Sequence, residues 1–181
     1  MNNYKYYKLK NQFKEEVLKL PYKLAINLKI IDFKENTFLN GQYKHNEKNI
    51  YINKHLLNTK SEKEIFSILM HELTHAIQNY KIDNRDFFKN EKKYIDLLDI
   101  CINKIEYPIV FCNINNDLCN FHINPSYVIY DKSNLLYILC LSEREAFEIQ
   151  DKINETNLLK EAYDTLKKIY KTNLSNEEIN K

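Results

Sequence analysis

Hydrophobic residues recur at intervals of three and four along several stretches of the chain, which is the spacing of one face of an α-helix. The stretch 5–20 shows this spacing, and Pro21 ends it. Its periodic residues are Tyr6, Leu9, Phe13, Val17 and Leu20. Similar patterns predict a helix across 88–105 and helical structure from 142 to 171.

The helix with the clearest beginning is predicted at residues 62–80. Ser61 and Glu64 form a capping box, in which each side chain accepts a hydrogen bond from the other residue's backbone N–H. The hydrophobic residues that follow lie on one face: Ile65, Phe66, Leu69, Leu73, Ala76, Ile77 and Tyr80. Ser142 and Glu145 have the same spacing and predict the beginning of a later helix.

The strand patterns are shorter than the helical ones. Residues 24–31 alternate between apolar and smaller or polar side chains, and residues 49–53 are β-branched and aromatic. Gly41, between them, indicates a turn. Residues 107–130 predict a hairpin with an Asn/Asp turn, followed by a third strand.

These elements predict an α+β fold in one domain covering 1–181. The chain has one glycine and three prolines, which favours long helices over a fold with many turns. A length of 181 residues is enough for one domain with a substantial core. We expect a small mixed sheet packed against the 62–80 helix, with further helices and a hairpin-containing insertion.

Charge and hydropathy narrow the classes of function. Hydrophobic residues make up 44% of the chain, charged residues make up 29%, and the net charge is +2. This balance gives no indication of a nucleic-acid partner. The longest apolar runs are too short to span a membrane, and the charged N-terminus does not resemble a signal peptide. We therefore predict a cytoplasmic protein.

The predicted 62–80 helix contains the sequence HELTH at 71–75. Because residues four apart lie on the same side of a helix, His71 and His75 can direct ring nitrogens at one metal ion. Zinc lowers the pKa of a bound water, and Glu72 lies within reach of that water without being a ligand. This pattern predicts a zinc hydrolase in which Glu72 is the general base and then the acid.

The sequence HELTHAIQ resembles the active-site helix of the zincin metallopeptidases. The preceding stretch GQYKHNEKNIYINKHLL is similar to the family's strand at the edge of the active-site cleft. The resemblance implies a peptide or protein substrate that pairs with this strand. It implies that Ile50, Tyr51 and Ile52 bind the substrate backbone.

A catalytic zinc usually has three protein ligands, so a third must follow the motif. The tight three-histidine pattern is excluded, because Gln78 and Lys81 occupy the relevant positions. The sequence SEREAFEIQ at 142–150 is similar to the ExxA element of the gluzincin branch, which implies that Glu143 is the ligand. Glu145 and His122 remain alternatives.

The sequence departs from the gluzincin pattern in two ways. Phe147 stands where many members have an acidic residue that orients a ligand histidine, so another group must do this here. In addition, 67 residues separate His75 from Glu143, which implies an insertion at about 81–135. This insertion is either a cap over the cleft or a structural extension.

Several further residues are candidates by type. An oxyanion donor could come from a set of residues downstream of the motif: His122, Tyr127, Tyr130 and Tyr137. The four cysteines are predicted to be reduced core thiols, although Cys112, Cys119 and His122 could in principle hold a structural zinc.

Three alternatives to a general peptidase stay open from the sequence. The first is a regulatory peptidase that cleaves a repressor. The second is a zincin-like scaffold with little or no catalysis that acts as an interaction module. The third is a helical binding protein in which the motif is fortuitous. The sequence does not indicate the oligomeric state.

Overall fold

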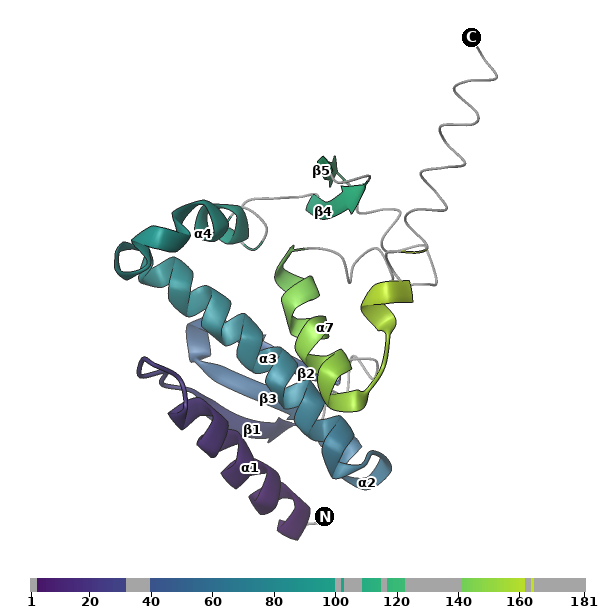
Figure 1. Cartoon of the computed structure of the whole chain (residues 1–181). Helices are drawn as coiled ribbons and strands as arrows, with labels where there is room; N and C mark the ends of the chain where they lie inside the picture. Colours follow the sequence, from purple (N-terminus) through teal and green to yellow (C-terminus); the bar gives the residue numbers. More distant parts are fainter. Residues whose placement is uncertain are drawn as a thin grey trace.

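The computed structural model describes residues 3–31, 40–99, 102, 109–114, 117–122, 141–161 and 164. Figure 1 shows a small sheet, the long helix α3 across it, and α7 on the other side of α3. The helices and strands are α1 (Asn3–Leu18), β1 (Asn27–Ile31), β2 (Gly41–Lys44), β3 (Asn49–Asn53), α2 (Leu56–Thr59), α3 (Glu62–Asp83), α4 (Lys92–Asp99), β4 (Ile109–Ile114), β5 (Asp117–His122) and α7 (Leu141–Asn154). Three short 3-10 helices are His45–Glu47, Arg85–Phe87 and Lys89–Glu91.

The first sheet has the strand order β1-β3-β2. Strand β3 pairs in parallel with β1 and antiparallel with β2, so it is hydrogen-bonded along both of its sides. The predicted mixed α+β class is therefore confirmed. The placement of Ile50, Tyr51 and Ile52 on an edge strand is wrong, because these residues lie in the central strand β3. They have no free edge for a substrate.

Strand β2, which with β1 forms the edges of this sheet in the described part of the chain, was not predicted from the sequence. Gly41 was expected in a turn, but it is the first residue of β2 and pairs with Ile52. Its sequence GQYK has a single large apolar side chain, Tyr43, so it shows no alternation of apolar and polar residues.

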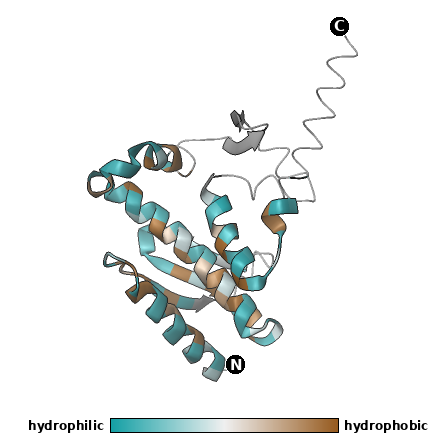
Figure 2. Cartoon of the chain, viewed as in Figure 1, coloured by the Kyte–Doolittle hydropathy of each residue, from teal (hydrophilic) through white to brown (hydrophobic). Residues whose placement is uncertain are grey.

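Helices α1 and α3 pack on one face of the first sheet, and α7 packs on α3. The alternation of side chains along β3 directs Ile50 and Ile52 toward this core. Figure 2 shows the mixture of hydrophobic and hydrophilic residues along α1 and α3 that such packing requires. The buried core residues include Leu9, Phe13, Leu28, Ile65, Leu69, Leu73 and Ala76.

Helix α3 begins with the predicted capping box. The Ser61 hydroxyl accepts a hydrogen bond from the Glu64 N–H at 3.2 Å, and the Glu64 carboxylate accepts from the Ser61 N–H at 2.8 Å. The backbone hydrogen bond from Ser61 is the main reason that the pKa of Glu64 is lowered to about 2. This cap fixes the first turn of the helix that contains the HELTH motif.

Helix α7 departs from two predictions. It begins at Leu141, so Ser142 lies inside the helix and the predicted second capping box is wrong. The helix also ends at Asn154, but residues 158–161 and 164 are helical again, so the expected continuous helix is interrupted at 155–157. Glu155 has the left-handed φ of 59°, and the Thr156 N–H bonds the Asp151 carbonyl at 3.1 Å, which turns the chain.

The predicted insertion is described in part. Within the helix expected at 88–105, the described residues contain the 3-10 helix Lys89–Glu91, then α4 at Lys92–Asp99, and residue 102 in a π-helical conformation. The predicted hairpin is confirmed as β4 and β5, in which Cys112 and Cys119 are register partners. Several predicted features lie outside the described residues: the third strand, Cys101, Cys140, Tyr127, Tyr130 and Tyr137.

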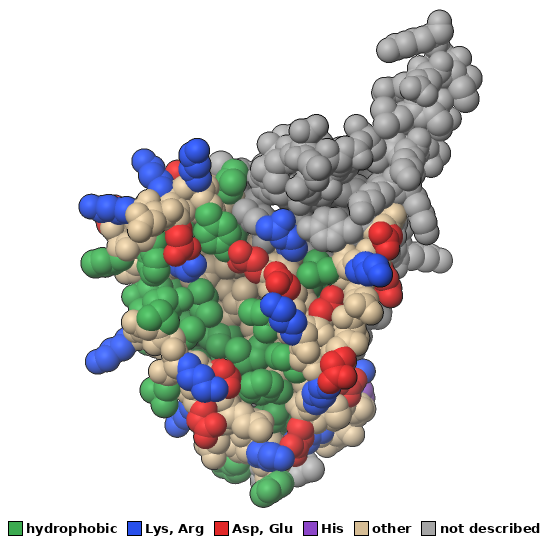
Figure 3. Space-filling view, in the orientation of Figure 1, with side chains coloured by type: hydrophobic (Ala, Val, Ile, Leu, Met, Phe, Trp, Pro, Cys, Tyr) green, Lys and Arg blue, Asp and Glu red, His purple; other side chains and the backbone are tan. Residues whose placement is uncertain are grey.

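Charged side chains of both signs are mixed on the face seen in Figure 3, with hydrophobic side chains gathered between them. This mixture agrees with the small net charge of +2. Among the residues that the structure describes, no helix has both the length and the apolar character required to cross a membrane.

Candidate metal centre

Helix α3 places His71 and His75 on the same side, one turn apart. Their Nε2 atoms are 3.2 Å from each other, and the two rings lie edge to face. Both side chains are largely shielded from solvent. The helix geometry predicted from the sequence therefore directs two ring nitrogens at one point.

Glu143, in the first turn of α7, brings a carboxylate to this pair. Its Oε2 lies 3.3 Å from His71 Nε2, and its Oε1 lies 3.5 Å from His75 Nε2. Among the described residues, these three side chains form the group that could hold a metal ion. Glu143 is thus the candidate third ligand that the fold brings to the histidines.

The separations within this cluster fit a tetrahedral zinc ion. Zinc bonds of about 2.0–2.1 Å place neighbouring ligand atoms about 3.3–3.4 Å apart at the corners of a tetrahedron. The two Nε2 atoms are 3.2 Å apart, which is close to that value, and the nearest carboxylate contacts of 3.3 and 3.5 Å involve different oxygens of Glu143. Taken with one ligand atom from each residue, the cluster lies within 4.8 Å. Two imidazoles and one carboxylate are also a usual donor set for catalytic zinc.

The carboxylate of Glu145 has different partners from that of Glu143. It accepts hydrogen bonds from the Gln78 amide and the Tyr94 hydroxyl. His122, the remaining candidate for the third ligand, is the last residue of β5, and its side chain lies outside what the structure describes.

Glu72 lies beside the cluster and faces β2. Its Oε2 accepts a hydrogen bond from the Tyr43 N–H at 2.7 Å, and its side chain is only 7% exposed. Burial raises the pKa of Glu72, although the charges of His75 and His71 oppose this. A buried carboxyl group with an elevated pKa is suited to accept and return a proton.

Opposite charges stabilise the buried cluster. Burial acts to lower the pKa of His75, but the hydrogen bond and charge of Glu143 outweigh it and raise the pKa to about 9. Burial acts to raise the pKa of Glu143, but its hydrogen bonds with His71 and His75 hold that pKa well below its usual range. The fold thus keeps a carboxylate ionised where a cation would bind.

The two histidines have different surroundings on the side away from the cluster. His75 Nδ1 is 3.1 Å from the Gln78 amide oxygen. His71 Nδ1 is buried and has no hydrogen-bond partner among the described residues, and the ring packs edge to face on Phe147. Gln78 therefore supplies the orienting contact that sequence reasoning left unassigned. Its position three residues after His75 places it on the same side of the helix, but many polar residues share that spacing, so the sequence alone did not identify it.

Gly41 allows β2 to approach α3 closely at this centre. A Cβ atom at this position would lie 2.9 Å from Ile68 Cγ2 and 3.1 Å from Glu72 Cγ. Carbon atoms in contact normally lie about 3.5–4.0 Å apart. The close approach brings the Tyr43 N–H within reach of the Glu72 carboxylate.

We expect Gly41→Ala to displace β2 from α3 and to cost about 1–3 kcal/mol of stability, as overpacking usually does. Thermal unfolding measures this cost. Ile68→Ala removes one of the crowded groups, so the double variant should lose less stability than the sum of the single variants. Additive losses would contradict the proposed crowding at Ile68.

Comparison of the chain with protein-family models, with curated proteins and with solved structures gives no match.

Proposed function

We propose that this protein is a zinc metallopeptidase of the zincin type, in which His71, His75 and Glu143 are the zinc ligands. The observation that carries the proposal is that one ligand atom from each of these three side chains lies within 4.8 Å of the other two. These atoms come from helices that are far apart in the sequence. If the HELTH motif had arisen by chance, there would be no reason for the Glu143 carboxylate of α7 to lie beside its two histidines.

Glu72 is the proposed general base. A zinc ion bound here would lower the pKa of a water ligand and polarise the carbonyl group of a substrate. The Tyr43 N–H holds one oxygen of the Glu72 carboxylate, which fixes the side chain next to the cluster. In the proposed reaction, Glu72 would accept a proton from water as its oxygen adds to the peptide carbonyl, and would donate that proton to the amine nitrogen as the C–N bond breaks.

Strand β2 is the proposed binding edge for the substrate. It pairs with β3 on one side, and the described part of the sheet contains no strand on its other side. The Tyr43 N–H points away from β3, because it is donated to Glu72. In an antiparallel ladder the C=O of the same residue faces the same side, so it could accept from the backbone of an extended peptide.

This binding edge replaces the one predicted from the sequence on β3. The substrate class remains an extended peptide or protein segment, because a strand edge recognises main-chain groups. The predicted cytoplasmic location remains part of this proposal.

Zinc analysis tests the proposed function directly. Purified protein is expected to contain one equivalent of zinc and to cleave members of a peptide library, with products identified by mass spectrometry. Removing the metal with a chelator should abolish cleavage, and adding zinc should restore it. Protein that binds no zinc, or that cleaves equally well after its removal, would refute the proposal.

A further inference from the structure

We propose that Gln78, Glu145 and Tyr94 form a hydrogen-bonded support that positions both His75 and Glu143 for metal binding. This inference rests on the proposed metal site. It assigns a positioning role to three residues from α3, α7 and α4, and it gives part of the predicted insertion a function at the centre.

The first step is the orientation of His75. Its Nε2 faces the cluster, so the neutral ring carries its proton on Nδ1 when Nε2 binds a metal. The Nδ1–H group then donates a hydrogen bond to the Gln78 amide oxygen, with 3.1 Å between Nδ1 and Oε1. Ligand histidines usually have such an acceptor, which fixes the ring and its tautomer.

The second step is the orientation of the Gln78 amide. Its Nε2 donates to the Ser142 carbonyl and to the Glu145 carboxylate, both at 2.9 Å. The opposite orientation would place the amide oxygen against these two acceptors. Gln78 is only 1% exposed, so water does not compete for these contacts. The partners on α7 therefore determine which end of the amide faces His75.

The third step connects the same amide to the third ligand. Ser142 immediately precedes Glu143 in the first turn of α7. The hydrogen bond to the Ser142 carbonyl therefore fixes the backbone of α7 one residue before the carboxylate that faces the histidines. One side chain thus sets the position of ligands on two helices.

Tyr94 completes the support from α4. Its hydroxyl donates a hydrogen bond to the same Glu145 oxygen that accepts from Gln78. Burial, together with the hydrogen bond to Glu145, raises the pKa of Tyr94, which keeps the hydroxyl available as a donor. Glu145 is therefore held between two donors and is oriented toward Gln78.

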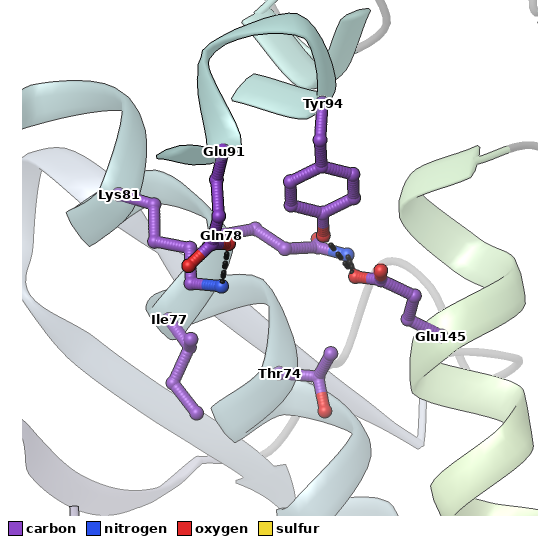
Figure 4. A pocket seen from close by; sticks show the side chains of 7 residues that line it. All are labelled: Thr74, Ile77, Gln78, Lys81, Glu91, Tyr94 and Glu145. Atoms are coloured by element: carbon purple, nitrogen blue, oxygen red, sulfur yellow. Dashed lines mark hydrogen bonds and ion pairs between the residues drawn. The ribbon is translucent and has the colours of Figure 1, made fainter. Parts of the chain in front are cut away.

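Figure 4 shows these contacts at the edge of a cavity of about 310 Å³ between α3, α4 and α7. The Gln78 amide, the Tyr94 hydroxyl and the Glu145 carboxylate point toward one another there. The Lys81–Glu91 ion pair, at 2.6 Å, also links α3 to the segment that precedes α4. This arrangement places part of the predicted insertion beside the cluster.

The test compares Gln78→Ala with Asn79→Ala. Asn79 is a matched control, because it is a buried amide on the same helix whose side-chain NH₂ donates to the His75 backbone carbonyl, at 2.9 Å, and not to the ring. Zinc affinity is measured by competition with a chromophoric chelator, and the visible spectrum of the cobalt-substituted protein reports on ligand geometry. We expect Gln78→Ala to weaken zinc binding by about 10–100-fold and to alter the spectrum. Asn79→Ala should preserve both.

A rescue variant separates positioning from general packing. Gln78→Glu combined with Glu145→Gln exchanges the acid and the amide, which preserves an acceptor for His75 and a hydrogen bond between residues 78 and 145 but removes the donor to the Ser142 carbonyl. We expect this variant to bind zinc more tightly than Gln78→Ala. It also keeps the test decisive if Gln78→Ala does not fold.

Each outcome separates this inference from the proposed function. Wild-type protein that binds no zinc would refute the metal site itself. Wild-type protein that binds zinc no more tightly than Gln78→Ala would overturn the positioning role alone. A folded exchange variant that binds no better than Gln78→Ala would overturn the part of the role assigned to the His75 acceptor and the 78–145 hydrogen bond.

Discussion

Glu72→Gln is expected to retain bound zinc and to lose most of the peptidase activity. A general base typically contributes about 10²–10⁴-fold to the rate, so the turnover number should fall within that range. The glutamine side-chain oxygen can still accept the Tyr43 N–H, so the position beside the cluster is preserved. Zinc content and peptide cleavage are measured on the same protein preparation.

Glu62→Gln is the matched control for this prediction. Glu62 lies on the same helix but pairs with Lys8 at the surface, at 2.5 Å. Removing its charge should change cleavage little, because exposed ion pairs contribute about 0–1 kcal/mol. A non-catalytic scaffold predicts no difference between wild type and Glu72→Gln. Equal cleavage by these two proteins would therefore exclude Glu72 as the base.

The predictions that succeeded depend on interactions close together in the sequence. The Ser61–Glu64 capping box and the three-to-four-residue spacing of apolar side chains are local, and they predicted α3 and its first residue. The relation between His71 and His75 follows from the same helix geometry. Strand β3 was predicted at the observed bounds of 49–53, because its five residues have strong β-propensity.

The features that the sequence did not predict depend on contacts between distant segments. Strand β2 is defined by its pairing with β3 and by the close approach at Gly41. Gln78 acquires its role only when α7 supplies the Ser142 carbonyl and the Glu145 carboxylate. Neither feature has a local pattern that distinguishes it from ordinary polar residues.

The choice between Glu143 and Glu145 as the third ligand also depends on contacts between distant segments. The sequence assigned Glu145 to a capping box, but α7 begins earlier and that cap does not form. Two residues two positions apart point about 200° away from each other around a helix, so only one can face the histidines. The packing of α7 on α3 selects Glu143, and it directs Glu145 to Gln78 and Tyr94.

Glu143→Gln is expected to weaken zinc binding by more than about 100-fold. Loss of an outer-shell partner, which contacts a ligand and not the metal, costs at most about that much. The amide lacks the negative charge that the buried centre offers to a cation, and neutral amides are uncommon zinc ligands. Glu148→Gln is the matched control, because this residue of α7 is exposed and pairs with Lys152. Glu145→Gln should weaken zinc binding by about 10-fold or less, the low end of the range for an outer-shell partner. Its amide oxygen can still accept a hydrogen bond from Gln78.

Thermal unfolding gives a second measure of the same ligand set that does not require a substrate. A ligand that binds only the folded state stabilises it by about 2.7 kcal/mol at a concentration 100 times its Kd. Zinc should therefore raise the Tm of wild type and of Glu148→Gln, but raise that of Glu143→Gln far less at the same concentration. An equal rise in all three proteins would show that the Glu143 carboxylate is not a ligand, and the metal would then have to be held without the one group that joins α7 to the two histidines.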